Sequence, residues 1–416
     1  MIIFNIEKII IKKLIQISII KKVYKFRRQN KKMNIYMDCS ATTPCDKRVI
    51  KAMKPFFSKK FGNPNSIHGY GNEAREAIER SRKIIADFLN CSKEEIFFTS
   101  SGTESNNTII KGVAFSKLGE KKKKIVTSTI EHPAVINVCE WLKKFGFEVV
   151  YIPVNSEGLV DLNILEKEVD KNTLIVSIMH VNNEIGTIEP IEKIARICES
   201  KGALFHTDAV QSFGKLKIDL SKIKVDFLSA SGHKIYGPKG IGLIYKRKEI
   251  KIEPLLHGGG QESGIRSSTE NVPGIVGFGE AVKICSERME GDAKDIGKLR
   301  DYLISQLLKI EGIKLNGSLN NRIWNNVNVS IKNVEGESLL MMLDKKGIAV
   351  STGSACSSKS LKASHVLKAI GLKDLEAHGS LRITLGRDNT KEQVDYVIKA
   401  IEECVKGLRK ISPNFN

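Results

Sequence analysis

The chain has 416 residues, which is too long for one ordinary domain and predicts two or three. Its hydrophobic fraction of 41% and charged fraction of 27% are typical of a soluble globular protein. The net charge of +20 invites a nucleic-acid or membrane partner. The basic residues beyond position 33 are spread evenly, however, without a basic stripe interleaved with aromatic side chains. We therefore expect no direct nucleic-acid partner and no membrane partner.

Residues 1–33 alternate isoleucine clusters with lysines. No apolar run there approaches the roughly 18 residues of a membrane span. The segment also lacks the apolar core and the small-residue cleavage site of a secretory signal. A translation start at Met33 is the interpretation that we favour, and it predicts a cytoplasmic protein. A basic surface helix or an organellar presequence is the alternative.

The eight cysteines are scattered and form no C-x-x-C pair. Zinc-ribbon and thioredoxin-type motifs are therefore absent, and no metal site is expected. Unpaired cysteines in a chain of this size indicate a reducing compartment.

Apolar strand-like runs alternate with helical patterns through the first two thirds of the chain. The strand-like runs are 95–99, 124–128, 147–152, 174–179, 203–208, 225–228 and 240–245. Helical patterns cover 73–89, 190–200 and about 274–310, and further helices are expected after 101 and 131. This alternation predicts an α/β fold with a largely parallel sheet, whose chemistry collects beyond the carboxyl ends of the strands. The polar residues expected there are Thr103, His132, Asn183, Asp208, Gln211, His233 and Lys234.

Lys234 lies in a small, hydroxyl-rich stretch, 229–238, between two apolar runs. A buried ammonium is costly, and burial shifts the pKa of a lysine readily. A lysine that forms a Schiff base needs such a setting. From this stretch alone, a surface lysine on a loop between strands is the alternative.

Residues 100–107 form a small polar turn between a strand-like run and a helix. Such a turn presents free backbone N–H groups to an anion, and Thr103 adds a hydroxyl. The spacing matches neither G-x-G-x-x-G nor a Walker loop, so it does not indicate a dinucleotide or a nucleoside triphosphate. Phosphate binding and an ordinary capped helix start both remain open here.

Asp208 lies at the end of a strand-like run, and Lys234 comes two strands later. An acid beside the ring nitrogen and a lysine in Schiff-base linkage are the two protein groups that pyridoxal phosphate requires. Gln211 lies near enough to reach the phenolic oxygen, and His132 could stack on the ring. The phosphate would be held by Gly102, Thr103, Ser231 and His233.

The stretches 207–211 and 230–240 resemble class V aminotransferase-type enzymes. The stretches 182–186 (Asn-Asn-Glu-Ile-Gly) and 354–356 (Ser-Ala-Cys) narrow the resemblance to cysteine desulfurases of the NifS/IscS type. The motifs follow one another in the expected order from about residue 35 to the end. The resemblance implies fold type I of the pyridoxal-phosphate enzymes, with a mostly parallel seven-stranded sheet in a large domain and a smaller α/β C-terminal domain.

The implied domain organisation has four parts. Residues 1–33 are a basic extension, untranslated or disordered, and residues 34–48 pack with the small domain. Residues 49–290 form the large cofactor-binding domain. Residues 291–416 form the small domain, which carries the catalytic cysteine.

The family takes sulfur from L-cysteine and yields L-alanine and an enzyme persulfide. The resemblance therefore implies roles for individual residues. Lys234 carries the cofactor, Asp208 pairs with its ring nitrogen, and Gln211 contacts its phenolic oxygen. His132 stacks on the ring and shuttles protons. The phosphate ligands are joined by Thr269 from a second subunit of a homodimer.

The resemblance also implies a substrate site. Asn183 and Arg382 would hold the substrate carboxylate, a bidentate role that suits arginine. Cys356 would be the nucleophile that attacks the substrate sulfur. It lies among Gly, Ser and Ala, a composition typical of an exposed loop, and a persulfide-forming cysteine must become a thiolate and move. A small loop residue without a chemical role is the alternative from composition alone. Arg266 is left out of the expected site because a structural arginine would fit equally well.

Two other classes of function compete with a desulfurase. A selenocysteine lyase or a plain aminotransferase would share the fold, but transamination needs no thiol such as Cys356. A non-catalytic or nucleic-acid-binding protein would need neither Lys234 nor Asp208. We expect the persulfide to pass to an iron–sulfur scaffold or another acceptor, with tRNA thiolation as a further use.

Overall fold

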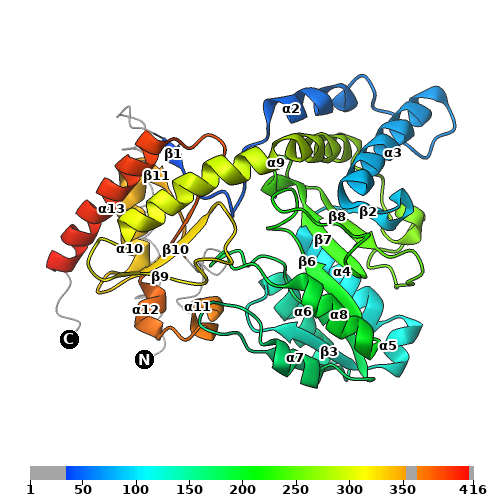
Figure 1. Ribbon diagram of the computed structural model, residues 1–416. Helices are drawn as coiled ribbons and strands as arrows, with labels where there is room; N and C mark the ends of the chain where they lie inside the picture. The colour runs from blue at the N-terminus through cyan, green and yellow to red at the C-terminus, as the bar shows by residue number, and fades with distance from the viewer. Residues whose placement is uncertain (1–33, 353–362, 412–416) are drawn as a thin grey trace, which may run out of the picture.

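The computed structural model describes residues 34–352 and 363–411. The basic extension 1–33 and the predicted nucleophile Cys356 lie outside the described residues. A sheet of seven strands forms the centre of the larger part of the molecule (Figure 1). Its strands are β2 (Ile96–Thr99), β3 (Lys124–Ser128), β4 (Glu148–Ile152), β5 (Thr173–Ser177), β6 (Leu204–Asp208), β7 (Phe227–Ser231) and β8 (Gly242–Lys246).

The strand order is β2-β8-β7-β6-β5-β3-β4, and only β8 runs against its neighbours. The other six strands therefore end at one edge of the sheet. This confirms the predicted mostly parallel seven-stranded α/β fold. The edge where these strands end carries the polar residues that the sequence predicts to be chemical.

Helices cover both faces of this sheet, which is why its strands read as continuous apolar runs. Successive residues of a strand point to opposite faces. Ile125, Ile175 and Phe227 thus belong to one buried cluster with α4 and α6, whereas Val126 and Leu228 belong to another with α3 and α8. The flanking helices are α3 (Gly69–Leu89), α4 (Gly102–Ala114), α5 (Lys117–Lys121), α6 (Pro133–Lys143), α7 (Leu162–Glu168) and α8 (Ile191–Lys201).

The C-terminal part is built on two small sheets. The first sheet is antiparallel and joins β9 (Ile313–Leu315), β10 (Asn326–Ile331) and β12 (Ser380–Thr384). The second sheet pairs β1 (Ile35–Tyr36) with β11 (Ile348–Ala349) in parallel. These strands share a hydrophobic cluster with α10 (Gly336–Lys345) and α13 (Lys391–Ile411). The start of the described chain thus packs with its end.

The long helix α9 (Val272–Leu307) runs from one part to the other (Figure 1). It packs on α3 in the larger part and on α13 in the smaller one. The remaining short elements are α2 (Lys47–Met53), η1 (Lys54–Phe57), η2 (Lys93–Glu95), η3 (Gly232–Lys234), η4 (Glu262–Gly264), α11 (His365–Ala369) and α12 (Asp374–His378). Across residues 34–352 and 363–411, no helix combines the length and the apolar character that a membrane span requires.

One detail around Lys234 differs from the prediction of a simple loop. The predicted loop begins at Ser229, but β7 continues to Ser231, and Lys234 then ends the 3-10 turn η3. Ser229 is fully buried, and its Oγ lies 3.0 Å from Nε2 of His206 on β6. Small hydroxyl residues fit this crowded central strand because their polar atoms are hydrogen-bonded within the sheet.

Candidate active site

A cavity of about 290 Å³ opens where the parallel strands end. Ten of the predicted site residues line it: Gly102, Thr103, His132, Asn183, Asp208, Gln211, Ser231, His233, Lys234 and Arg382. They come from six separate stretches of sequence. The sheet topology brings them together because the strand that precedes most of them ends at this edge.

Lys234 is held by the segment that crosses over from β1. Its Nζ donates to the carbonyl oxygens of Ser40 at 2.5 Å and Ala41 at 2.8 Å. The carbonyl of the neighbouring His233 accepts from the backbone N–H of Thr43 at 2.9 Å. Residues 40–43, to which the sequence assigned no role, thus fix the lysine at the cavity wall.

Asp208 ends β6 and is buried, with its carboxylate held from two sides. Nδ2 of Asn106 donates to one oxygen at 2.7 Å, and the backbone N–H of Val210 donates to the other at 2.9 Å. These bonds fix the orientation of the carboxylate. Asn106 also lines the cavity, yet sequence reasoning missed it. Asn106 lies one helical turn after Gly102 on α4, and that spacing could have indicated that it faces the same cavity.

Gln211 lies in the turn after β6. Its Nε2 donates to the Ser40 carbonyl at 2.9 Å, and its Oε1 accepts from Nζ of Lys215 at 3.3 Å. Lys215 is a second residue that sequence reasoning missed. The Ser40 carbonyl therefore receives bonds from both Gln211 and Lys234.

The first turn of α4 faces the cavity with its backbone N–H groups. Ser101 caps the helix, and its Oγ accepts from the N–H of Glu104 at 3.1 Å, which leaves earlier N–H groups of the turn for an anion. A Cβ added to Gly102 would lie 2.6 Å from Cγ2 of Val210. Glycine therefore lets the turn come this close to the end of β6 without displacing the Val210 side chain.

His233 and Ser231 lie beside this helix start. Nδ1 of His233 is 3.1 Å from Oγ1 of Thr42. Burial lowers the pKa of His233 to about 4, and the nearby cation of Lys234 adds to that effect. Ser231 is buried, and its Oγ donates to the carbonyl of Ile241 at 3.5 Å, a long bond that another acceptor can replace.

His132 caps α6 at the cavity wall. Its Nδ1 accepts from the N–H of Ala134 at 3.1 Å, so the neutral ring carries its proton on Nε2. Burial lowers its pKa, and the carboxylate of Asp208 opposes that shift. The ring is therefore neutral near pH 7.

Arg382 reaches the cavity from β12 in the smaller part of the molecule. Its guanidinium donates to the carbonyl of Asn183 at 3.0 Å and to Oδ1 of Asp38 at 2.9 Å. Its side chain is 3% exposed, and Nε has no hydrogen-bond partner among the described residues. A buried, partly unsatisfied guanidinium is suited to an incoming carboxylate. The pairing with Asp38 could not be read from the sequence, because 344 residues separate the two.

The Aminotransferase class-V family model matches residues 35–397. The chain is 51% identical over 383 residues to the cysteine desulfurase IscS of Dictyoglomus turgidum, covering 92% of this chain and 97% of that protein. It is also 51% identical to the IscS of Methanosarcina thermophila, covering 91% and 94%. The chain belongs to the cysteine desulfurases of the class V aminotransferase family.

Solved structures agree with this membership. A NifS-like protein matches with a TM-score of 0.85 and 45% identity, covering 90% of this chain and 100% of that one. SspA in complex with cysteine matches with a TM-score of 0.75 and 39% identity, covering 84% and 98%. The family implies pyridoxal phosphate as the cofactor of a cysteine desulfurase.

The cavity of this desulfurase fits such a cofactor. It offers a lysine amine, a fixed carboxylate and a helix start that packs closely against Val210 at a glycine. The unsatisfied Nε of Arg382 adds a site for a carboxylate. Among the described residues, no group of three or more His, Cys, Asp or Glu side chains could hold a metal ion.

Of the predicted site residues that the structure describes, one, Thr269, does not line this cavity. Cys356 is outside the described residues. Thr269 is exposed and lies away from the cavity of its own chain, so its contact with the cofactor of a second subunit stays a prediction. Arg266, which we left out of the site, forms an ion pair with Glu104 at 2.8 Å on the helix that opens at Gly102.

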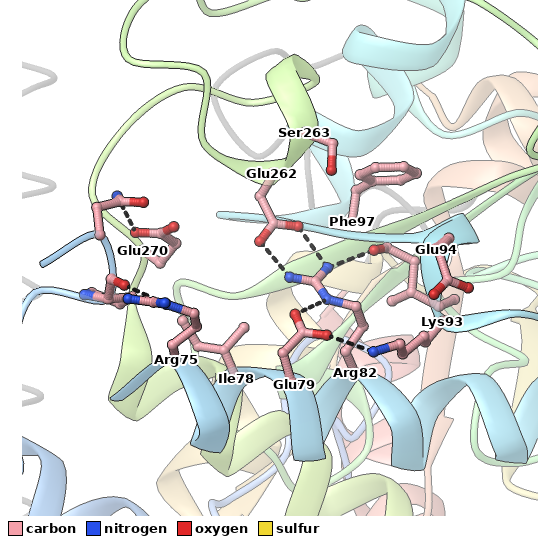
Figure 2. Close-up of a pocket in the computed structure, with 13 residues that line it drawn as sticks. Arg75, Ile78, Glu79, Arg82, Lys93, Glu94, Phe97, Glu262, Ser263 and Glu270 are labelled. Carbon is pink, nitrogen blue, oxygen red and sulfur yellow. Dashed lines mark hydrogen bonds and ion pairs between the residues drawn. The ribbon is translucent and has the colours of Figure 1, made fainter. Parts of the chain in front are cut away.

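A second cavity, of about 300 Å³, lies between α3 and the segment that carries Thr269 (Figure 2). Its central pair is buried: both terminal nitrogens of Arg82 donate to Glu262, each at 2.8 Å. Glu262 also accepts from the N–H of Phe98 at 2.7 Å. Glu79 joins Arg82 on its outer side. These charges are matched to one another, so the second cavity is structural.

Proposed function

We propose that this protein removes sulfur from L-cysteine with pyridoxal phosphate, giving L-alanine and a persulfide on Cys356. The observation that supports this most is the meeting of Lys234, Asp208 and Arg382 in one cavity, from three distant stretches of chain. An amine for the cofactor, an acid for its ring and a guanidinium for a substrate carboxylate are the groups that the reaction needs.

Bound pyridoxal phosphate withdraws electrons from the α-carbon of the amino acid attached to it. Lys234 would hold the cofactor through its amine, which the Ser40 and Ala41 carbonyls fix at the cavity wall. Asp208 holds a proton at the ring nitrogen, and Asn106 fixes the carboxylate that does so. Gln211 donates to the phenolic oxygen. The N–H groups of the α4 start, together with Ser231 and His233, hold the phosphate.

Arg382 and Asn183 orient the substrate through its carboxylate. The hydrogen bond between them, at 3.0 Å, couples the two ligands. His132 is neutral near pH 7 and carries its proton on Nε2, so it acts first as a proton donor at that atom. The amine of Lys234, which lines the same cavity, would be the second group able to move protons at the substrate.

Cys356 supplies the nucleophile. Its thiolate attacks the sulfur of the substrate, the bond from that sulfur to Cβ breaks, and the electron pair stays with the three-carbon fragment. Protonation of that fragment gives alanine, and the transferred sulfur remains on Cys356 as a persulfide. One cysteine and one enzyme thiol thus give one alanine and one persulfide, without an external oxidant.

The persulfide then passes to an iron–sulfur scaffold or another acceptor protein, with tRNA thiolation as a further use. Free cysteines support a reducing, cytoplasmic setting, since the seven described cysteines form no disulfide. A relative from Arthroderma benhamiae, 50% identical over 91% of this chain and 76% of that protein, is named a mitochondrial cysteine desulfurase. Cell fractionation with an antibody distinguishes the two compartments.

We also propose a homodimer in which Thr269 completes the phosphate site of the other subunit. Four large apolar side chains between residues 57 and 70 are exposed: Phe57, Phe61, Ile67 and Tyr70. Asn65, in the same loop, lies 3.4 Å from Glu270, next to Thr269. An apolar surface of this kind marks a protein interface. Light scattering should give a mass of about two chains, and Ile67→Asp should shift it towards one.

The domain division into residues 34–48, 49–290 and 291–416 is part of the same proposal. It is supported by the separate hydrophobic cluster that Ile35 and Met37 form with residues from Ile296 onward. Native-state hydrogen exchange in which residues 34–48 and 291–416 open together, separately from 49–290, would support the division, and a single opening of the whole chain would contradict it.

A selenocysteine lyase is the second candidate, since it shares the fold and cofactor. The test is release of alanine and sulfide from L-cysteine plus a reductant, by wild type and by Cys356→Ala, with visible spectra of both. The proposal predicts that the wild type and the variant are equally yellow. It also predicts that only the wild type releases alanine and sulfide. A yellow variant that works at full rate would favour the lyase. A colourless wild type that pyridoxal phosphate cannot restore would contradict the cofactor.

A further inference from the structure

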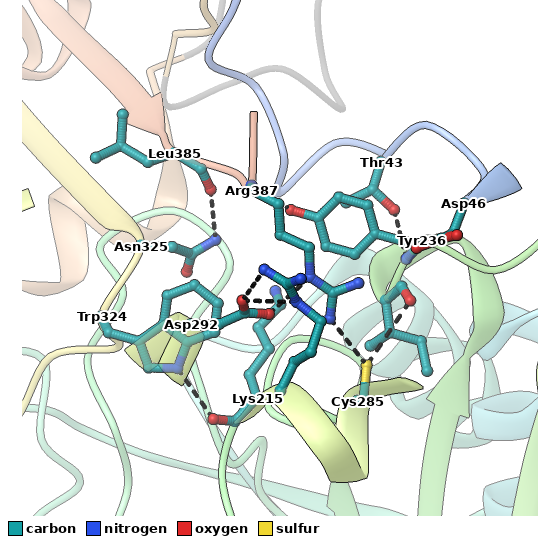
Figure 3. Close-up of polar contacts among 12 residues, drawn as sticks. Thr43, Asp46, Lys215, Tyr236, Cys285, Asp292, Trp324, Asn325, Leu385 and Arg387 are labelled. Atoms are coloured by element: carbon teal, nitrogen blue, oxygen red, sulfur yellow. Dashed lines mark hydrogen bonds and ion pairs between the residues drawn. The ribbon is translucent and has the colours of Figure 1, made fainter. Parts of the chain in front are cut away.

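Lys215 is a buried cation to which the chemistry above gives no role. It lies in the turn after β6, four residues beyond Gln211, and is 6% exposed. Figure 3 shows its side chain among those of Cys285, Asp292 and Trp324. Nε1 of Trp324 donates to the backbone carbonyl of Lys215 at 3.0 Å, which fixes the chain at this point.

No acid neutralises this lysine among the described residues. The nearby Asp292 is already bonded to Arg387 at 2.6 Å and to Arg288 at 3.1 Å. The ionisable groups that act on Lys215 are the thiols of Cys39 and Cys285, and burial lowers its pKa to about 8. Burying an ammonium without a neighbouring acid lowers the stability of the fold. A contact of Lys215 that serves the active site would account for its place there.

That contact is the hydrogen bond from Lys215 to Gln211. The ammonium of Lys215 can only donate, so it must face the oxygen of the Gln211 amide. The carbonyl of Ser40 can only accept, so it must face the nitrogen. Both partners select the same orientation of the amide. One N–H of Gln211 is used at Ser40, and the other remains for the cavity that Gln211 lines.

We propose that Lys215 is a positioning residue that holds the Gln211 amide so that it presents an N–H, rather than its oxygen, to the phenolic oxygen of the cofactor. The inference rests on the proposed function, because Gln211 needs a bound ring to donate to. Without Lys215 the amide loses one of its two constraints. The phenolic oxygen then loses a donor and becomes more basic.

Lys215→Met tests this, because it keeps most of the side-chain volume and removes the donor and the charge. We expect pyridoxal phosphate to bind about tenfold more weakly, the size of one lost hydrogen bond. We also expect the yellow band to persist to a pH about one unit higher, because a more basic phenolic oxygen holds the linkage proton more tightly. Lys215→Gln, which keeps an N–H donor, should recover part of both effects and serves if the methionine variant does not fold.

Lys246→Met is the matched control. Lys246 is also 6% exposed, but it donates to the carbonyls of Arg247, Lys248 and Ile250 at the opposite edge of the sheet. The Lys246→Met variant should have a lower melting temperature, with unchanged affinity for pyridoxal phosphate and an unchanged pH range of the yellow band.

Coupling to Gln211 decides the mechanism. In a Gln211→Ala background, Lys215→Met should change cofactor affinity less than twofold, because Lys215 acts through the amide. A full tenfold loss in that background, or a wild-type spectrum in the single variant, would overturn the inference while leaving the desulfurase intact. A wild type that forms no yellow band would overturn the inference and the proposed function together.

Discussion

Two cavities of this molecule have nearly equal volumes, about 290 and 300 Å³, but their charges are arranged in opposite ways. In the second cavity, Arg82 and Glu262 bond to each other and to the backbone around them (Figure 2). In the first, the guanidinium of Arg382 is held by the Asn183 carbonyl and by Asp38, and its Nε has no hydrogen-bond partner among the described residues. The volume of a cavity therefore does not show whether it is a binding site. The first cavity is marked by the guanidinium of Arg382, which protein groups hold at two nitrogens while the third has no partner among the described residues.

The largest effect is expected in the second cavity. Arg82→Met should lower the free energy of unfolding by about 3 kcal/mol, because it leaves Glu262 buried without its cation. The yellow colour of the loaded protein should remain. Urea unfolding and a visible spectrum measure both. Arg80→Met is the control, since the ion pair of Arg80 with Glu76 is exposed, and it should cost at most about 0.5 kcal/mol. Loss of the cofactor in Arg82→Met would break the contrast between the cavities.

The next effect concerns the first cavity. Asp208→Asn should lower kcat/KM for L-cysteine by at least about a hundredfold, the size of one lost electrostatic group at a reacting centre. Asp226→Asn is the matched control, because Asp226 is as deeply buried but caps the N–H of Phe205, away from the cavity. It should reduce stability and leave kcat/KM per folded molecule unchanged. Equal losses of activity in both variants would contradict the role of Asp208.

Two histidines, the half-buried His233 and the fully buried His206, should respond differently to an anion. His233 lines the cavity, with a pKa lowered to about 4, while His206 is held between Ser177 and Ser229, with a pKa lowered by burial to about 3. Phosphate should raise the pKa of His233 by about one unit and leave His206 unchanged. NMR titration of histidines labelled at Cε1 measures both.

In each case the folded pKa is below the unfolded one, so stability is full above about pH 6.5 and falls as the pH drops towards these values. A shift at His206, or none at His233, would place the anion elsewhere.

The smallest effect separates two helix caps. Ser101→Ala on α4 and Asp161→Ala on α7 should each cost about 1 kcal/mol of stability, because each cap bonds free N–H groups of its helix. Only Ser101→Ala should also weaken phosphate binding, since α4 opens on the cavity. Calorimetry with inorganic phosphate measures the difference. Equal phosphate affinity in the two variants would contradict an anion site at α4.

Much of the first cavity follows from the sequence. Lys234, Asp208 and His132 each follow a strand-like run, and parallel strands bring such positions to one edge. The seven-stranded sheet follows from the alternation of apolar runs and helices, although β7 extends three residues beyond its predicted end.

The supporting residues do not follow from the sequence. Asn106 lies on a helix face that periodicity alone cannot orient towards Asp208. Asp38 reaches Arg382 across 344 residues of sequence, and Ser40 reaches Lys234 across 194. Lys215 reads as one lysine among many in a Lys-rich chain. These groups become visible only when tertiary packing sets their partners.

The most direct test of the account is to find which lysine carries the cofactor. The purified protein is loaded with pyridoxal phosphate, reduced with borohydride, digested and examined by mass spectrometry. The chain holds 52 lysines, so labelling by chance would be spread over many peptides. The account predicts the added mass on Lys234 alone, and none anywhere in Lys234→Ala. A stoichiometric label on another lysine, or an unlabelled Lys234 in yellow protein, would contradict it.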